Sequence, residues 1–471
     1  MVEVSCEAWS DTGSPYREDP DTPVALVTRR RAAHRGVNRR PDSRPLIPRL
    51  SASPHRLAPP AESGDPVDFA FSELTEEWRG RLQEFMDEHV MPAEAAYEAE
   101  MREAGGDPAV TPPVIETLKV EARRRGLWNL FLPDDRWGAG LSVLEYAPLA
   151  EVTGRSPWIA PEAINCSAPD TGNMEILAQF GTPDQIQEWL VPLLDGEIRS
   201  CFSMTEPSVA SSDATNIACR IEEDGCDLLI TGRKWWSSGA ISSRCKVAIV
   251  MGVTSPDADP YHRQSMVLVP LDEAGVEIVR NVNVFGYRER GGHAEILYDG
   301  VRVPKSNLLG EEGSGFAIAQ ARLGPGRIHH CMRLIGMAER AFDIMCERAW
   351  ERVAFGKPLA EQGVVQEWIA EARMKIEQAR LMVLKTAWLI DTVGVKGARI
   401  EVSAIKVVVP EMATWVIDRG IQLLGGAGVS DDFPLASLYV HARTIQIADG
   451  PDEVHKRSVA RRELRRFSQG A

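Results

Sequence analysis

The 471-residue sequence lacks the cysteine pairs and long apolar runs that mark disulfide-stabilised, zinc-binding or membrane-spanning proteins. Its eight cysteines are scattered and include no Cys-x-x-Cys pair, which favours free thiols in a reducing compartment over a disulfide framework or a zinc site. No apolar run approaches the roughly 20 residues that a membrane-spanning helix needs. These absences predict a soluble, cytoplasmic protein with no metal site and no membrane insertion.

Common nucleotide-binding and hydrolytic motifs are also missing. Gly425-Gly426-Ala427-Gly428 and Gly313-Ser314-Gly315 both differ from the G-x-G-x-x-G fingerprint, and neither follows a predicted strand. There is no G-x-S-x-G nucleophile elbow and no H-E-x-x-H pair. His329 and His330 are adjacent, so they point in different directions on a helix. Hydrolase and metalloenzyme functions are therefore disfavoured.

Acidic residues outnumber basic residues by 68 to 53, which gives a formal net charge of −15. A nucleic-acid partner is disfavoured, because contacts to phosphates require a basic face. With 44% hydrophobic and 26% charged residues, the chain is globular and long enough for two or three domains.

Residues 1–65 form a separate region that is rich in arginine and proline. Such a composition cannot build a hydrophobic core. A transit peptide should be poor in acidic residues, whereas Glu3, Glu7 and Asp11 come first here. We expect a disordered extension, or a start codon that was assigned too early.

The remaining sequence predicts three domains in the order helical, β-rich, helical. In residues 66–198, apolar residues recur every four positions at Leu74, Trp78, Leu82 and Met86, and Thr182-Pro183-Asp184-Gln185 is typical of a capping box after a helix ending at Gly181. Residues 199–308 have β-rich runs at 247–250 and 265–269 and a hairpin signal at Asp224-Gly225. Residues 309–471 predict a helical bundle, with an apolar stripe formed by Val365, Ile369, Ala372, Ile376, Ala379, Val383, Ala387 and Ile390.

One carboxylate near the carboxyl end is a candidate catalytic base. Asp449 stands before Gly450-Pro451, and proline is favoured at the first position of a helix. Asp452 and Glu453 follow, as expected at the positive end of a helix dipole. Asp449 would then lie just outside the helix and face a bound substrate. On these residues alone, an ordinary acidic helix start ranks first.

Five segments in the second and third predicted domains carry a resemblance to a known family. Phe202-Ser203-Met204-Thr205-Glu206-Pro207, followed by Ser211-Ser212-Asp213, looks like a first flavin signature, and Lys234-Trp235-Trp236-Ser237-Ser238 looks like a second. Arg352 to Lys357 and Gln422 to Gly426 resemble segments that hold the adenosine diphosphate half of a cofactor bound to a neighbouring subunit. Asp449-Gly450 falls where the family carries its catalytic acid and glycine. Over residues 66–466, the chain resembles the acyl-CoA dehydrogenases.

The resemblance implies an α+β multidomain fold, with an N-terminal all-α domain, a middle β-barrel or sandwich domain and a C-terminal helical bundle. It also implies FAD as cofactor, an acyl-CoA substrate, electron-transferring flavoprotein as electron acceptor, and a homodimer or homotetramer. Residues 163–174 and 448–455 are most similar to the branch that animals fuse to an aminoglycoside-phosphotransferase-like kinase, a domain that this sequence does not contain. That branch implies long, branched or hydroxylated acyl chains.

The resemblance also assigns roles to individual residues. Asp449 would take the α-proton, its backbone N–H would bind the thioester oxygen, and Gly450 and Arg327 would contact substrate. Each cofactor residue also has a plain structural alternative, such as a turn cap, a core aromatic or a solvated charge. The implied cofactor-binding residues are Phe202, Met204, Thr205, Ser211, Ser212, Trp236, Ser237, Ser238, Arg352, Phe355, Gln362, Gln422, Gly425, Gly426 and Glu453.

Several positions depart from the family pattern. The base is Asp449 rather than the commoner Glu, and Ala448 stands where an aromatic residue is common, which suggests a roomier acyl pocket. Pro451 replaces a usual Thr. The loop after residue 207 is one residue longer, so either Ser211 or Ser212 would face substrate. Some members instead carry the base next to the arginine that corresponds to Arg327, where this chain has Gly326.

We therefore expect FAD-dependent oxidation of an acyl-CoA to the trans-2-enoyl-CoA. A flavin oxidase of the same fold is an alternative, because nitroalkane oxidases of this fold also use Asp. Further alternatives are a CoA-thioester-binding protein without catalysis and a scaffold for a separate kinase.

Overall fold

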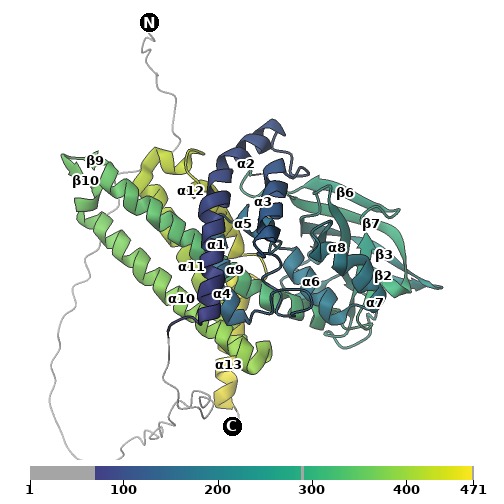
Figure 1. Cartoon of the computed structure of the whole chain (residues 1–471). Coiled ribbons are helices and arrows are strands. Elements are labelled where there is room, and N and C mark those ends of the chain that lie inside the picture. The colour runs from purple at the N-terminus through teal and green to yellow at the C-terminus, as the bar shows by residue number, and fades with distance from the viewer. Residues whose placement is uncertain (1–68, 288–290, 469–471) are drawn as a thin grey trace, which may run out of the picture. The chain divides into compact units, whose positions relative to one another are not determined.

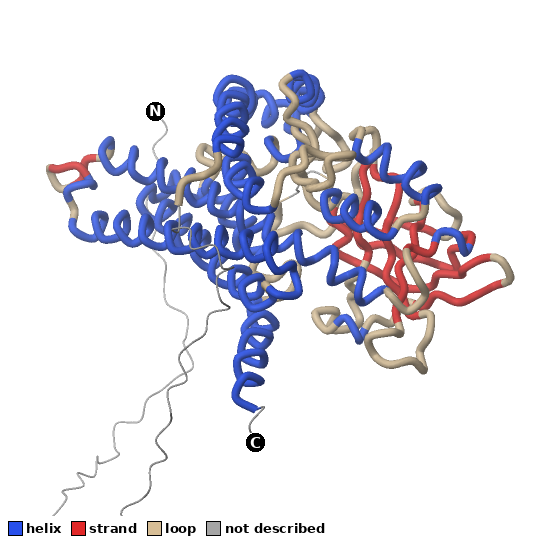
Figure 2. Tube along the Cα trace, turned by 60° about the horizontal axis from the view of Figure 1, so that its bottom comes forward, coloured by secondary structure: helices blue, strands red, loops and turns tan. Residues whose placement is uncertain are grey.

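The computed structural model describes residues 69–287 and 291–468. The extension expected at residues 1–65 lies outside the described residues. By its residue contacts the chain separates into two units, with the boundary after Asp68. The features described below belong to the second unit, Phe69–Ala471. Within it, the strands gather at one side and the long helices extend away from them (Figures 1 and 2).

The first part of this unit is helical. Its main helices are α1 (Glu73–Phe85), α2 (Met91–Glu103), α3 (Pro113–Arg124), α4 (Val143–Gly154), α5 (Ala160–Ala163) and α6 (Asp170–Phe180), followed by the short α7 (Pro183–Gln185) and α8 (Val191–Leu194). The predicted capping box is present, with Thr182 and Gln185 each bonded to the backbone of the other, and Gly181 follows the last residue of α6.

The predicted apolar face of α1 is only partly correct. Leu82 and Met86 are buried and Trp78 packs against the core, but Leu74 is 47% exposed. A strict spacing of four residues advances about 40° per step around a helix of 3.6 residues per turn. Leu74 is therefore rotated away from the face that Met86 buries.

The middle part is an eight-stranded sheet. Its order is β6-β7-β3-β2-β4-β5-β8, and β1 pairs in parallel with β4. The predicted hairpin is confirmed, because Asp224 pairs with Asp227 across Gly225, which has a φ of 65°. The strands are β1 (Arg199–Ser203), β2 (Arg220–Asp224), β3 (Asp227–Ser238), β4 (Cys245–Val253), β5 (Gln264–Pro270), β6 (Val276–Asn281), β7 (His293–Pro304) and β8 (Leu308–Leu309).

The last part is a bundle of five helices, α9 (Gly315–Glu351), α10 (Gly363–Gly397), α11 (Arg399–Leu424), α12 (Leu435–Ile445) and α13 (Asp452–Ser468). A small hairpin, β9 (Val353–Ala354) and β10 (Lys357–Pro358), joins α9 to α10. The apolar stripe predicted in α10 faces the core: six of its eight residues are buried, and Ile369 and Ile390 pack against the same core. The predicted fold class, helical then β then helical, is confirmed.

Helix α9 connects the parts of the molecule. At about 1.5 Å per residue, its 37 residues extend roughly 55 Å, from the sheet to the β9–β10 hairpin. It packs against α4, α6, α10 and α11. No helix in the described ranges combines the length and apolar character needed to cross a bilayer. The same ranges contain no group of three or more His, Cys, Asp or Glu side chains arranged to hold a metal ion.

Helices α4 and α9 cross in backbone contact at two glycines. A Cβ on Gly336 would overlap the carbonyl oxygen of Glu151, and a Cβ on Gly154 would overlap the carbonyl of Arg333. The contact is between backbones, so a side-chain movement cannot relieve the overlap. These two glycines therefore fix how closely the helical domain packs on α9.

We expect Gly336→Ala to lower the free energy of unfolding by an amount at the upper end of the roughly 1–3 kcal/mol typical of overpacking. Gly420→Ala in α11 is the matched control, because its Cβ would have no neighbour nearer than 3.4 Å and alanine favours a helix by about 1 kcal/mol. Urea denaturation of both variants checks this expectation. Equal stability of the two variants would contradict it.

Candidate active site

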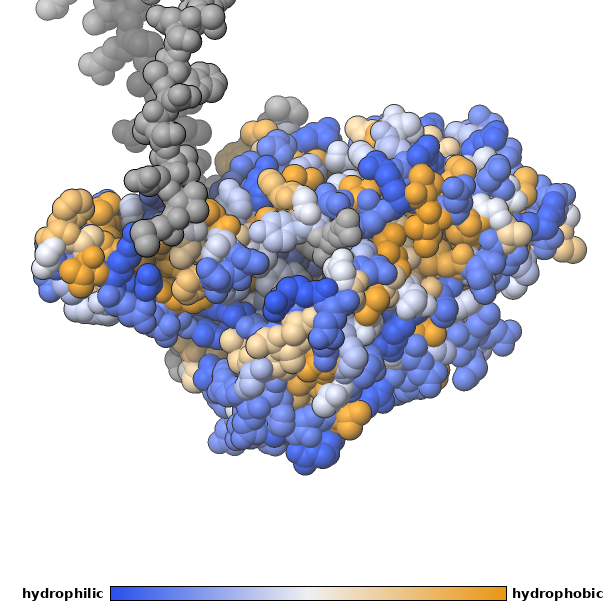
Figure 3. All heavy atoms as spheres, turned by 90° about the horizontal axis from the view of Figure 1, so that it is seen from above, coloured by the Kyte–Doolittle hydropathy of each residue, from blue (hydrophilic) through white to orange (hydrophobic). Residues whose placement is uncertain are grey.

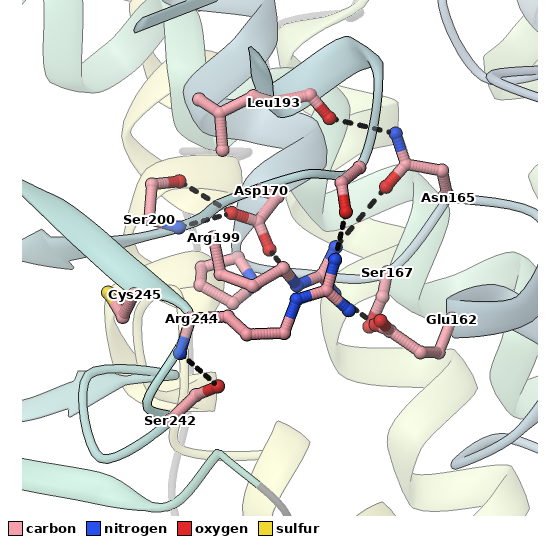
Figure 4. Close-up of polar contacts among 12 residues, drawn as sticks. Glu162, Asn165, Ser167, Asp170, Leu193, Arg199, Ser200, Ser242, Arg244 and Cys245 are labelled. Atoms are coloured by element: carbon pink, nitrogen blue, oxygen red, sulfur yellow. Dashed lines mark hydrogen bonds and ion pairs between the residues drawn. The ribbon is translucent and has the colours of Figure 1, made fainter. Parts of the chain in front are cut away.

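A buried polar network joins the helical domain to the first strand of the sheet (Figure 4). Arg199, at the start of β1, forms ion pairs with Glu162 of α5 and, at 3.2 Å, with Asp170 of α6. The second oxygen of Asp170 accepts hydrogen bonds from the backbone N–H and the hydroxyl of Ser200, both at 2.6 Å. The network therefore fixes the start of β1, the strand that contains Phe202.

A cavity of about 110 Å³ borders this network. Its walls include Asp170, Arg199 and Arg244 on one side and Ser238 and His293 on the other. A volume of this size holds a few water molecules and is too small for a dinucleotide.

We expect Arg199→Met to destabilise the protein by about 3–5 kcal/mol, because it leaves the buried Asp170 carboxylate without its cation and leaves Glu162 paired with Lys119 alone. Arg220→Met is the matched control, since Arg220 and its partner Glu222 are both more than half exposed and such pairs contribute about 0–1 kcal/mol. Denaturation midpoints of the two variants measure the difference. If both lose the same small amount, the network does not have the assigned role.

The first predicted flavin signature surrounds the end of β1. The ring of Phe202 lies under the Arg322 guanidinium, 4.1 Å from its central carbon to the ring centroid. The Met204 carbonyl accepts a hydrogen bond from Lys234, and the Thr205 hydroxyl donates one to the Trp235 carbonyl at 2.6 Å.

The two candidate serines of the following loop differ in their surroundings. Ser211 Oγ accepts a hydrogen bond from the Glu206 N–H at 2.8 Å, whereas Ser212 is exposed. The hydroxyl of Ser211 is therefore used to hold its own loop.

The second signature lies at the end of β3. Trp236 has a φ of 56° and is 38% exposed, and its ring centroid lies 5.4 Å from that of His293. Ser238 Oγ lies 2.8 Å from His293 Nδ1. Ser237, by contrast, is fully buried, and its hydroxyl bonds to Ser203 at 2.9 Å. The side chain of Ser237 is therefore part of the sheet interior.

Asp449 lies in the base loop, residues 448–451, between α12 and α13. It has a left-handed φ of 56°, which is uncommon for a residue other than glycine. Its carbonyl accepts a hydrogen bond from Arg327 Nε at 3.1 Å and from His455 Nε2 at 3.2 Å. These two donors hold the backbone of the base loop against α9 and α13.

The start of α13 differs slightly from the prediction. The helix begins at Asp452, and Pro451 precedes it and accepts a hydrogen bond from the Val454 N–H at 3.0 Å. Gly450 has a φ of 102°, and a Cβ there would lie 2.9 Å from His455 Nε2. Packing against His455 and the backbone conformation are therefore sufficient reasons for glycine at this position.

The Asp449 carboxylate is largely buried, with 19% of its side chain exposed. Burial raises its pKa, but the basic side chains around it outweigh burial and hold the pKa below the ordinary value. Those side chains are His330 and the charged Arg322, Arg327 and Lys406. The carboxylate is therefore ionised at neutral pH, as a proton acceptor must be.

The alternative base position faces the same space. A Cβ on Gly326 would lie 3.7 Å from Asp449 Oδ2. A longer side chain at residue 326 would thus enter the region that Asp449 occupies.

Six of the predicted cofactor residues lie elsewhere in the chain. Arg352, Phe355 and Gln362 come from the segment around the β9–β10 hairpin, and Gln422, Gly425 and Gly426 come from the end of α11. The hairpin lies at the opposite end of the bundle from the sheet (Figure 1). The structure therefore does not bring these six residues together with Trp236 within one chain.

The distal residues form a group of their own. Arg352 Nη1 donates hydrogen bonds to the carbonyls of Leu423 and Leu424, at 3.1 and 2.9 Å, beside Gly425. Phe355 is fully exposed, and Val353 and Trp350 are each more than 60% exposed. Apolar atoms gather at this end of the molecule (left in Figure 3). Glu453 lies apart from this group, exposed in the first turn of α13.

Sequence reasoning missed four side chains around the base, namely Arg322, His330, Lys406 and His455. A signal existed for His330, because it follows Gly326 by four residues and so lies on the same face of α9. Arg322 precedes Gly326 by four residues and so carried the same signal, whereas Lys406 and His455 come close to Asp449 only through tertiary packing.

Models of the acyl-CoA dehydrogenase N-terminal, middle and C-terminal domains match residues 72–197, 201–301 and 313–464. The chain belongs to the acyl-CoA dehydrogenase family. Members of this family use FAD, which defines the cofactor that the site must accommodate. The exposed indole of Trp236, bordered by Ser238 and His293, fits a flat ring system, and the exposed group around Arg352 and Phe355 fits an anionic nucleotide.

Individual relatives agree with this family membership. The relative described as "Probable acyl-CoA dehydrogenase FadE2" of Mycobacterium tuberculosis is 62% identical over 400 residues, which cover 85% of this chain and 98% of that relative. Human acyl-CoA dehydrogenase family member 11 is 51% identical over 82% of this chain, and the match spans only 50% of that relative. The chain thus spans about half the length of that relative.

Solved acyl-CoA dehydrogenase structures are similar as well. A structure from Mycobacterium abscessus has a TM-score of 0.82 and 51% identity, and it covers 85% of this chain and 100% of its own. A glutaryl-coenzyme A dehydrogenase structure, with a TM-score of 0.73 at 22% identity, supports the fold alone.

Proposed function

We propose that this chain oxidises an acyl-CoA thioester at C2 and C3 to the trans-2-enoyl-CoA, with Asp449 as the base that takes the C2 proton. The observation that supports this most strongly is the setting of Asp449. Its carboxylate is ionised although the site is largely buried. Its backbone has a left-handed conformation, and two side-chain donors bond to its carbonyl.

Separate groups would polarise the thioester, remove the C2 proton and accept the hydride. FAD, when bound, supplies the acceptor for the hydride that leaves C3. Among the described residues, the N–H of Asp449 has no backbone acceptor, so it is available to polarise the thioester oxygen. The Asp449 carboxylate removes the C2 proton that this polarisation makes acidic. Trp236 and Phe202 border the reaction site with aromatic surface.

Finer features of this function are also proposals. We propose a long, branched or hydroxylated acyl chain, in keeping with the small Ala448 next to the base. We propose Ser212 as the substrate-facing serine, because Ser211 is bonded to its own loop. Electron-transferring flavoprotein is the proposed acceptor. The separation of the Arg352 group from Trp236 supports at least a dimer, in which each group serves the cofactor of the neighbouring subunit.

We expect Asp449→Asn to keep FAD bound but to lower turnover by at least about 100-fold, the lower end of what general base catalysis contributes. Asp452→Asn, three residues away in the first turn of α13, is the matched control and should retain most of the activity. The measurement is the rate of anaerobic flavin bleaching by a panel of straight, branched and hydroxylated acyl-CoAs. Near-normal bleaching by the Asp449→Asn protein would defeat the assignment of the base.

A carboxylate placed at residue 326 should partly replace Asp449 as the base. Asp449→Ala alone should be inactive, and adding Gly326→Glu should restore part of the bleaching rate, because residue 326 faces the same space at 3.7 Å. Gly363→Glu, a glycine at the start of α10, serves as the matched control in the same background and should restore nothing. If neither double variant exceeds Asp449→Ala, the two positions do not share one reaction site.

A flavin oxidase remains the second candidate, because the base is an Asp. Hydrogen peroxide formation with a nitroalkane, compared with dye reduction by an acyl-CoA, separates the two activities. A protein whose flavin no thioester bleaches would instead be a non-catalytic binding protein. A stable complex with a separate kinase would support a scaffold.

A further inference from the structure

His330, which lies on α9, directly faces the proposed base, Asp449. Its Nε2 lies 3.6 Å from Oδ2 of Asp449, and only 18% of its side chain is exposed. It stands one helical turn after Gly326, and the absence of a side chain at that glycine leaves the approach to Asp449 open. The adjacent His329 points elsewhere and packs edge-on against Tyr146, with 5.1 Å between ring centroids.

The groups around His330 come from every element packed at this point. Arg333 lies on α9 itself, Lys406 comes from α11, and His441 comes from α12. His455 of α13 bonds to the carbonyl of the same Asp449. Among these groups, the Asp449 carboxylate is the anion that His330 contacts.

The imidazole of His330 is neutral at neutral pH. Burial lowers its pKa, Asp449 opposes this effect, and Arg333, His441 and Lys406 lower the pKa further, to about 3. A neutral imidazole carries one N–H donor and one acceptor nitrogen. Because an ionised carboxylate only accepts hydrogen bonds, the contact to Asp449 requires the proton on Nε2.

We propose that His330 is a positioning residue for the base, with its Nε2–H donating to Oδ2 of Asp449 so that the other carboxylate oxygen, Oδ1, is aimed at the C2 hydrogen. The 3.6 Å separation shortens to a hydrogen bond when the substrate closes the site, as catalytic contacts commonly do. An Asp side chain is one methylene shorter than Glu, so its carboxylate has fewer positions available and needs a partner that fixes its orientation. This role rests on the proposed function of Asp449.

The role has two consequences in the reaction. The proton removed from C2 ends on Oδ1 of Asp449, while the C–H electron pair forms the new double bond as hydride leaves C3. Oδ2 remains hydrogen-bonded to the neutral His330, which keeps its own proton throughout. Since a donor to the charged form lowers the pKa of a carboxyl group, the loss of His330 should raise the pKa of Asp449.

The test compares two variants, His330→Leu and His330→Gln, with the wild-type FAD-loaded protein by stopped-flow bleaching with an acyl-CoA across pH. His330→Leu removes the donor and should slow bleaching on the order of 10- to 100-fold, as a small misplacement of a reacting group does. It should also move the acid limb of the rate profile to higher pH by about one unit. His330→Gln keeps an N–H donor and should keep the acid limb of the wild-type protein.

Each outcome either supports or overturns the positioning role of His330. A Leu variant with the wild-type rate and acid limb overturns the inference, and so does a Gln variant that behaves like Leu. If the Leu variant fails to bind flavin, His330→Asn, whose amide is too short to reach, replaces it under the same criteria. Loss of flavin from all three variants would show a structural role and would also overturn the inference. If wild-type protein is not bleached, or Asp449→Asn stays active, the proposed function fails instead.

Discussion

The site depends on a carboxylate kept ionised in a place that is largely withdrawn from water. Burial alone would favour the neutral acid, and a neutral Asp449 could not accept a proton. The basic side chains around it reverse that preference. The charged Arg322 and Arg327 lie on α9, together with the neutral donor His330, and the charged Lys406 lies on α11. The packing of α9 against the base loop is therefore an electrostatic requirement as well as a structural one.

Helix α9 meets this requirement because its position is fixed along its length. Backbone contact at Gly336 and Gly154 sets its distance from α4, and Arg322 bonds to Asn173 of α6 at 2.8 Å. The network around Arg199 fixes β1 against α5 and α6, so that Phe202 meets the Arg322 guanidinium. The glycine crossing and the Arg199 network thus help to bring α9 and the end of β1 together.

The fold was largely predictable from sequence, because periodicity and capping are local signals. The capping box at Thr182, the hairpin at Asp224 and the α10 stripe all depend on neighbours in the chain. The placement of Asp449 outside α13 was predictable for the same reason. Leu74 was misjudged because a strict four-residue repeat drifts around the helix.

The surroundings of the base were not predictable in the same way. Lys406 and His455 are separated from Asp449 in sequence or point toward it only after folding, so no local pattern marks them. Arg322 and His330 carried a signal in their spacing of four residues from Gly326, but that signal has meaning only once residue 326 is known to face Asp449. The flavin-like motif likewise did not reveal that the side chain of Ser237 bonds to Ser203 inside the sheet.

The proposed reaction begins with removal of the C2 proton by Asp449, and isotope exchange measures that step without hydride transfer. A 3-thia-acyl-CoA has no hydrogen at position 3 to transfer, so incubation with FAD-loaded protein in deuterium oxide reports proton removal at C2 alone by mass spectrometry. We predict rapid deuterium incorporation with the wild-type protein and almost none with Asp449→Asn. Equal incorporation by the two proteins would contradict the account.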